Sequence, residues 1–250
     1  MDEVSIGAAP ALVWMPDEMT TPSIVGLDAD DTLWQSEQFF KLTEARFVDL
    51  LSEYAEGADL SARLLRAEKR NLQFYGYGIK GFVLSMIETA IDVTHGQVSA
   101  SIIQEILGAG REMLNHPILP LPQVRETLEN LNGTYRLVLI TKGDLFDQER
   151  KLAQSGLGEL FHGIEIVSDK TPETYKRIFD RHGDGPDRAV MVGNSLKSDI
   201  VPAIAAGCWG VFIPHELTWV LEHVEPPTHH PRFKQLNGFN ELYEFITKIS

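Results

Sequence analysis

The chain has 250 residues, of which 43% are hydrophobic and 23% charged, and its formal net charge is −14. This composition is typical of a globular protein that can bury a sizeable core, and the negative charge argues against a nucleic acid or an anionic membrane as partner. A single cysteine, Cys208, excludes an internal disulfide, and no apolar run reaches the ~20 residues of a membrane span, so we expect a cytoplasmic protein.

Residues 1–21 mix small, proline and acidic residues and predict an N-terminal extension. The first strand signal is the apolar run Ile24–Leu27, which ends in the carboxylates Asp28, Asp30 and Asp31. Because crowded carboxylates repel one another, a counter-charge is needed, and a divalent cation with oxygen ligands suits them. Open α/β sheets bind ligands beyond the carboxyl ends of their strands, so this strand end is a predicted reaction centre.

Helical periodicity replaces strand signals between residues 37 and 117. Apolar residues recur at helical intervals over 37–56, 60–72, 81–93 and 99–114. Prolines at 117, 120 and 122 then break the pattern. The pattern predicts a smaller all-helical cap domain over residues 37–117, inserted after the first strand of a core domain that comprises residues 22–36 and 118–250.

Beyond residue 120, short apolar strands alternate with helices. Strands are predicted over 136–140, 163–167, 188–192 and 210–213, and helices over 124–131, 148–155, 171–182, up to 206, and 239–249. Such alternation implies an α/β fold with a doubly wound parallel sheet and right-handed crossovers. The predicted helical cap therefore sits above the carboxyl ends of the strands.

Four of the predicted strands end in polar residues. These are Asp28 and Asp30, then Thr141 and Lys142, then Lys170, and finally Asn194 and Asp199. In a parallel sheet all four turns face one crevice. Phosphoryl transfer to a carboxylate needs such a set: a nucleophilic carboxylate, a second carboxylate that moves protons, a divalent cation, and donors for the phosphoryl oxygens.

These segments resemble the four motifs of the haloacid dehalogenase superfamily, in its phosphatase branch with a helical cap of the C1 type. Asp-x-Asp-x-Thr matches 28–32, a strand ending in Ser or Thr matches 139–141, a Lys before a helix matches Lys170, and Gly-Asp followed by a further Asp matches 193–199 except at Asn194. The matches occur in order across residues 22–213. The resemblance implies a Rossmann-like core and a magnesium-dependent phosphatase that works through an aspartyl-phosphate.

The resemblance also implies roles for the first two carboxylates. Asp28 would be the nucleophile and would bind Mg²⁺ with its second oxygen. Asp30 would be the general acid and base, with its backbone carbonyl also reaching the metal. The dehalogenating branch lacks a carboxylate at this position, so Asp30 favours hydrolysis of phosphate monoesters. Asp31 is interpreted as a solvated or helix-capping residue outside the site, and Asp144 as a helix cap.

Phosphate and metal binding fall on the other motifs. Thr141 and Lys170 would hold the phosphoryl group, with help from the backbone near Lys142. Asp199 would be a metal ligand, directly or through water. Asn194 stands where the family often has Asp, and a neutral amide there would weaken the binding of magnesium.

One loop of the predicted cap carries a second signal. The segment 75–82 contains three glycines, which allow the backbone to break one helix before the next. In the resembling family a glycine-containing cap loop helps select the substrate, so Tyr77 and Lys80 are candidates for contact with the leaving group. The alternative is a plain turn between helices. His215 and Trp219, after the last strand, either line the crevice or pack in the core.

A cap of this size argues for a small phosphorylated metabolite rather than a protein as substrate. Mutases of the same family also keep the second Asp, so a phosphosugar mutase with the same nucleophile remains an alternative. A further alternative is a non-enzymatic binding or regulatory protein on this fold, which Asn194 favours slightly. Neither the substrate nor the oligomeric state follows from the sequence.

Overall fold

One parallel sheet forms the centre of the molecule, which is a computed structural model describing residues 21–250. Within this range the strands are β1 Ile24–Leu27, β2 Arg136–Lys142, β3 Gly163–Val167, β4 Ala189–Gly193, β5 Trp209–Phe212 and β6 Phe233–Gln235. They pair in parallel in the order β3-β2-β1-β4-β5-β6. This confirms the predicted doubly wound sheet. The predicted N-terminal extension lies, apart from Thr21, outside the described residues.

The helices fall into two groups along the chain. Four follow β1 with no strand between them: α1 Glu37–Leu50, α2 Gly57–Tyr75, α3 Ile79–Val93 and α4 Ala100–Asn115. Five others are α5 Val124–Asn132, α6 Leu145–Ser155, α7 Pro172–His182, α8 Val201–Ala206 and α9 Leu242–Lys248. Among residues 21–250 there is no helix with the length and apolarity that crossing a membrane requires.

The sheet is covered on both faces, as a parallel sheet requires. Val25 and Leu27 of β1 belong to a core shared with α5, α6 and α9, whereas Ile24 faces a second core shared with α7 and α8. At Gly26 a Cβ atom would lie 2.9 Å from the ring of Phe179, so the absence of a side chain lets α7 pack closely on β1. Because both faces are closed, the strand ends are the open part of the sheet.

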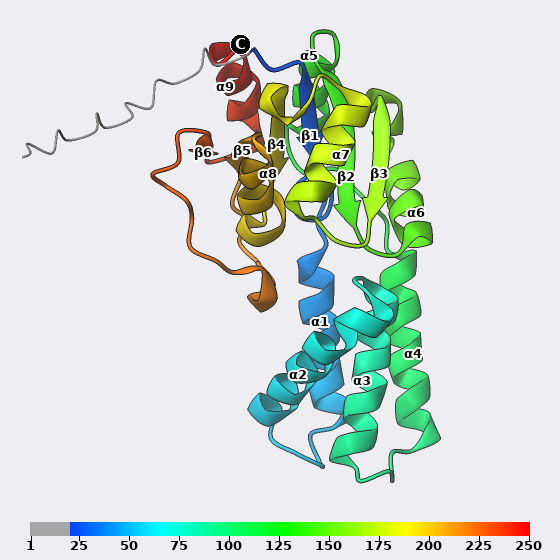
Figure 1. The fold of residues 1–250 in the computed structure, drawn as a ribbon. Coiled ribbons are helices and arrows are strands. Elements are labelled where there is room, and N and C mark those ends of the chain that lie inside the picture. The colour runs from blue at the N-terminus through cyan, green and yellow to red at the C-terminus, as the bar shows by residue number, and fades with distance from the viewer. Residues whose placement is uncertain (1–20) are drawn as a thin grey trace, which may run out of the picture.

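Helices α1 to α4 pack around an apolar core of their own. Its buried members include Phe47, Leu60, Leu64, Phe82, Met86 and Ile106. Figure 1 shows these helices grouped beyond the carboxyl ends of the strands, with the segment between β5 and β6 extending toward them. Two segments connect the helical group to the sheet, one before α1 and one after α4. A β-bridge between Trp34 and Pro120 joins these two segments. The space between sheet and helices therefore has walls from both groups.

Candidate active site

A cavity of about 410 Å³ lies between the strand ends and helices α1 to α3. The residues that line it include one or more from each of the four sequence motifs: Asp28, Asp30, Thr141, Lys142, Lys170, Asn194 and Asp199. These residues come from the ends of β1, β2 and β4 and from the loop after β3. The parallel strand order brings them to one place, although up to 171 positions separate them along the chain (199 − 28 = 171).

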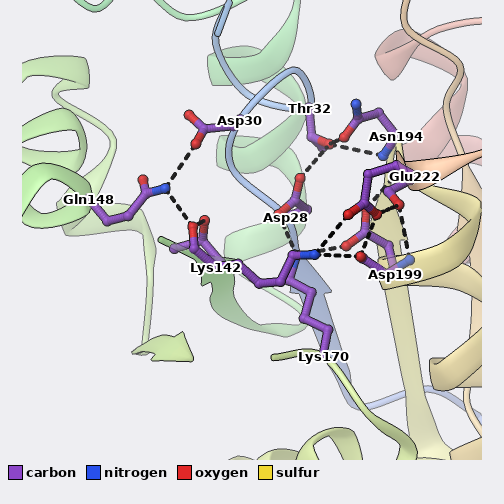
Figure 2. Close-up of polar contacts among 12 residues, drawn as sticks. Asp28, Asp30, Thr32, Lys142, Gln148, Lys170, Asn194, Asp199 and Glu222 are labelled. Carbon is purple, nitrogen blue, oxygen red and sulfur yellow. Dashed lines mark hydrogen bonds and ion pairs between the residues drawn. The ribbon is translucent and has the colours of Figure 1, made fainter. Parts of the chain in front are cut away.

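The buried ammonium of Lys170 joins two carboxylates. It donates to Oδ1 of Asp28 and, at 2.7 Å, to Oδ1 of Asp199, and all three side chains are buried. Figure 2 shows this group at the end of β1. Burial and the charge of Asp199 raise the pKa of Asp28 to about 7, although Lys170 opposes the shift. Two carboxylates and one ammonium leave a net negative charge, which favours a further cation.

The turn after β4 positions Asp199. Its Oδ2 accepts a hydrogen bond from the backbone N–H of Ser195 at 2.9 Å. A Cβ atom on Gly193 would collide with the Asp199 carboxylate, so the motif requires glycine at the end of β4. Ser195 also caps the short π-helical turn Leu196–Ile200 by accepting from the backbone N–H of Ser198 at 3.0 Å. The turn thereby directs Asp199 toward Asp28 and Lys170.

The side-chain amide of Asn194 lies beside Asp28 and the backbone of Asp30. The amide lies 3.3 Å from Oδ2 of Asp28 and 3.2 Å from the backbone oxygen of Asp30. With its nitrogen toward these atoms it donates hydrogen bonds, and with its oxygen toward them three oxygens converge, as in sites for hard cations. No cluster of three or more His, Cys, Asp or Glu side chains within residues 21–250 could hold a metal. The converging oxygens fit Mg²⁺, which here would also depend on the Asp30 carbonyl and on Asn194.

Three donors hold the carboxylate of Asp30. The indole N–H of Trp34 donates to Oδ1 at 2.8 Å, and the ammonium of Lys151 lies 2.9 Å from Oδ1. The amide of Gln148 donates to Oδ2 at 2.8 Å (Figure 2). Burial alone would raise the pKa of Asp30, but Lys151 and these hydrogen bonds outweigh burial and lower it. Asp30 is therefore ionised at neutral pH in this arrangement and is ready to accept a proton.

Gln148 and Lys151 were not among the candidates from the sequence. They lie three residues apart on α6 and so share one face of that helix. Lys151 also pairs with Asp147 at 3.5 Å. Helix α6 starts at Leu145, earlier than predicted, because Asp144 caps it by accepting from the backbone N–H of Asp147. The spacing is visible in the sequence, but only the contacts of these two side chains with Asp30 in the folded chain show that they serve this carboxylate.

The two residues at the end of β2 differ in what they can offer a phosphate. Thr141 is 1% exposed and lines the cavity. The ammonium of Lys142 is engaged elsewhere: it lies 3.0 Å from Oε1 of Glu222, 2.6 Å from Oγ of Ser198, and 3.9 Å from the ring centre of Tyr77. A contribution of Lys142 to phosphate binding would therefore come from its backbone. Glu222 follows β5 in an irregular segment and had no sequence signal.

The loop between α2 and α3 places its two candidate residues differently. Tyr77 lines the cavity, next to Trp219, with 6.2 Å between the ring centres. Lys80 does not line the cavity and instead pairs with Asp144 at 2.9 Å, which ties α3 to the start of α6. Of the two, Tyr77 is thus the one placed to meet a leaving group.

Asp31 caps helix α1, as interpreted, but it also lines the cavity and so does not lie outside the site. Its Oδ1 accepts from the backbone N–H of Ser36 at 2.8 Å, and its Oδ2 accepts from that of Glu37 at 3.0 Å. His215 lies 3.7 Å from Asp31 and 3.2 Å from Gln35. His215 therefore packs beside the segment that connects β1 to α1 and does not line the cavity.

The carboxylate of Glu68, on α2, also faces the cavity and gives a testable pH effect. The indole N–H of Trp219 donates to its Oε2 at 3.1 Å, while burial raises the pKa of Glu68 from 4.5 to about 7. Between these pH values the folded protein keeps a proton that the unfolded chain loses, so stability falls as pH rises. Glu68→Gln removes this loss of stability at high pH. We expect the free energy of unfolding of the variant to exceed that of the wild type by roughly 1–2 kcal/mol at pH 8, and by less at pH 5.

Urea unfolding at both pH values measures this difference. Glu88→Gln is the matched control with the opposite sign, because the hydrogen bond from Asn71 lowers the pKa of Glu88. This control variant should be less stable than the wild type, and more clearly so at pH 8. A gain for Glu68→Gln that is equal at the two pH values, or a loss at pH 8, would contradict the assignment.

Comparison with known proteins gives consistent results. The sequence pattern of haloacid dehalogenase-like hydrolases matches residues 22–207. A haloacid dehalogenase-like family hydrolase from Xanthomonas campestris has a similar crystal structure, with a TM-score of 0.82 and 42% identity over 92% of each chain. A glyceraldehyde 3-phosphate phosphatase from Methanothermobacter thermautotrophicus is 27% identical over 214 residues, which are 80% of this chain and 90% of that protein.

A third similarity concerns the fold alone. The structure of the HAD-hydrolase YfnB from Bacillus subtilis, bound to magnesium, has a TM-score of 0.62 at 17% identity and covers 91% of this chain and 99% of that one. At this level of identity the likeness extends to the arrangement of sheet and helices.

Proposed function

This chain belongs to the haloacid dehalogenase-like hydrolase family, and we propose on that basis that it is a magnesium-dependent phosphatase of a small phosphorylated metabolite. The family predicted from the four motifs is confirmed by the match over residues 22–207. The observation that carries the proposal is the buried group of Asp28, Lys170 and Asp199 at the base of a cavity. The relative named as a glyceraldehyde 3-phosphate phosphatase supports a small phosphate ester as substrate.

In the proposed first step, a carboxylate oxygen of Asp28 attacks phosphorus, and the bond between phosphorus and the ester oxygen breaks. The leaving oxygen takes a proton from Asp30, whose protonated form is favoured once the negative charge of the phosphate ester lies beside it. Lys170 and Thr141, which line the same cavity, hold the phosphoryl oxygens while charge moves between them. Magnesium, when bound, supplies positive charge that neutralises the phosphoryl group and the carboxylates together.

In the proposed second step, Asp30 removes a proton from water, and the water oxygen attacks the aspartyl-phosphate. Phosphate is released, and the carboxylate of Asp28 is restored. The proton that Asp30 takes from water is the one that it gives to the leaving group in the next turnover. The contacts of Asp30 with Lys151 and Gln148 favour its ionised form and so support this second step.

We propose that helices α1 to α4 act as the cap in this reaction. Helices α1 to α3 line the cavity on the side opposite the strand ends, and so does Tyr77 from the loop between α2 and α3. Exclusion of bulk water strengthens the electrostatic contacts inside and limits competing hydrolysis. The ion pair between Lys80 and Asp144 would hold these helices against the core.

A panel of phosphorylated metabolites, assayed for phosphate release with magnesium and with a chelator, tests the proposed function. We expect release from at least one small ester and its loss with the chelator. Product analysis with phosphosugars distinguishes the mutase alternative, because a mutase isomerises the sugar phosphate without net release. A protein that binds a phosphate ester but turns over none would be a non-enzymatic member of the family.

The substitution Asn194→Asp tests the role of the neutral amide beside the metal site. A carboxylate there adds a negative charge next to Asp28, so we expect the magnesium concentration for half-maximal activity to fall by roughly fivefold to tenfold, or about 1–1.4 kcal/mol. A magnesium titration of phosphate release measures the shift. Asn240→Asp, which adds the same charge at an exposed position outside the cavity, is the control. An unshifted titration would remove Asn194 from the metal site.

A further inference from the structure

The leaving group of the substrate has to lie on the cap side of the cavity. The phosphoryl group is bound at the strand ends by Asp28 and Lys170 under the proposed function, so the alcohol part extends toward α1, α2 and the segment after β5. This side carries the carboxylates Glu37 and Glu68 and the indole of Trp219. Its charges and rings therefore decide which alcohol fits.

Every lysine that lines this cavity is already paired with a carboxylate. The lysines that line it are Lys41, Lys142, Lys151 and Lys170, and each forms an ion pair with a carboxylate. Among the described residues that line the cavity, no lysine or arginine is left without such a partner. A carboxylate or second phosphate on the leaving alcohol would find no unengaged cation and would lie among like charges.

Negative charge is in excess on the cap wall. Glu37, Glu44 and Glu68 share a single lysine, Lys41, which lies 3.1 Å from Glu44 and 3.9 Å from Glu37. Burial raises the pKa of Glu37 and of Glu68 to about 7, and neighbouring carboxylates add to both shifts. A cation placed between these side chains would offset the burial and the mutual repulsion of the carboxylates, which Lys41 alone does not balance.

Aromatic rings provide a second feature that suits a cation. Tyr77 and Trp219 meet at 81°, and the ring face of Tyr77 already carries the ammonium of Lys142 at 3.9 Å. The indole N–H of Trp219 is bound to Glu68, so ring and carboxylate form one wall. Aromatic rings together with carboxylates bind ammonium groups through cation–π and ion-pair attraction. The rings point to the same ligand chemistry as the acidic residues beside them.

We propose that the leaving alcohol carries a cationic ammonium group, so that the substrate is the phosphate monoester of an amino alcohol. The proposal rests on the proposed function and names the substrate class for the same site. The phosphate lies over Asp28 and Lys170, and the ammonium lies against Glu68 and Trp219. Hydrolysis transfers the phosphoryl group to Asp28 and then to water, and releases the free amino alcohol.

Three series of alkyl phosphates, matched in length, test the proposal at pH 7.5 in magnesium. Each alkyl chain ends in an amine, a hydroxyl or a carboxylate, in lengths of two, three and five carbons, so that reach does not limit the result. At the best length we expect kcat/KM for the amine to exceed that for the hydroxyl by about tenfold, or 1.4 kcal/mol, with the carboxylate lowest.

The variant Glu68→Gln tests the assigned contact. It is expected to reduce the ratio of kcat/KM between amine and hydroxyl substrates about tenfold, whatever its effect on either rate alone. Glu129→Gln, on the exposed surface of α5, removes the same charge and should leave the ratio unchanged. An unchanged ratio in Glu68→Gln would overturn the role of Glu68.

The remaining outcomes separate the two proposals. Turnover of all three series with a preference for hydroxyl or carboxylate overturns the amino alcohol and leaves the phosphatase in place. Absence of phosphate release from every ester, while p-nitrophenyl phosphate is also stable, overturns the proposed function and this inference with it.

Discussion

Replacement of Asp28 by Asn is expected to abolish phosphate release, with a fall in kcat of roughly 10⁴-fold or more. An amide cannot attack phosphorus to form the acyl phosphate, so no aspartyl-phosphate is made. The substitution removes one buried negative charge beside Asp199, and the amide oxygen still accepts from Lys170, so the fold is expected to persist. Phosphate release in magnesium measures the loss, and thermal unfolding checks that the variant is folded.

Asp31→Asn is the matched control for this change. It alters the same residue type three positions away, but Asp31 caps α1, and asparagine is also a good helix cap. Activity of this control is expected to stay within a few-fold of the wild type. Equal phosphate release by the wild type and Asp28→Asn would refute the nucleophilic role of Asp28.

Of the substitutions considered, Lys170→Met is expected to lower the free energy of unfolding most. Lys170 is the only lysine or arginine among residues 21–250 that forms an ion pair with Asp28 or Asp199, and all three side chains are buried. Removing it leaves two buried carboxylates without a counter-charge, which costs about 3–5 kcal/mol. Urea unfolding at pH 7 in the absence of magnesium measures this cost. Activity should fall as well, because the phosphoryl oxygens lose a cation.

A double variant distinguishes charge from packing. Lys170→Met combined with Asp199→Asn removes one of the two buried charges, so it is expected to recover a large part of the lost stability while activity stays low. A loss caused by the changed shape of the side chain would not be relieved by Asp199→Asn. Wild-type stability in the single variant Lys170→Met would show that the two carboxylates do not depend on the lysine.

Much of the fold could be predicted because its signals are local. The apolar run Ile24–Leu27 and the later strands each carry their pattern within a few residues, and the helical region from 37 to 115 has its own periodicity. Strand β6, Phe233–Gln235, was missed because three residues at the edge of a sheet are too few for a period of two to show. The early start of α6 was missed because apolar periodicity does not report the cap at Asp144.

The motif residues of the site could be predicted for a related reason. In a parallel sheet every strand points the same way, so a residue just after a strand lies at the shared edge whichever strands are neighbours. Asp28, Thr141 and Asp199 therefore line one cavity, as their positions after strands indicate. Asp31 and Asp144, which were set aside as caps, do cap helices.

The contacts that tune the site depended on the tertiary structure. Gln148 and Lys151 meet Asp30 across 118 and 121 positions of sequence, and Trp219 meets Glu68 across 151. No local pattern encodes such pairs, because they form only when the fold brings α6 to Asp30 and the segment after β5 to α2. The sequence by itself determined the order of the elements and which residues follow the strands. Side-chain packing between distant elements decided which charges are paired, and with them the ionised state of Asp30 and the excess of carboxylates on the cap wall.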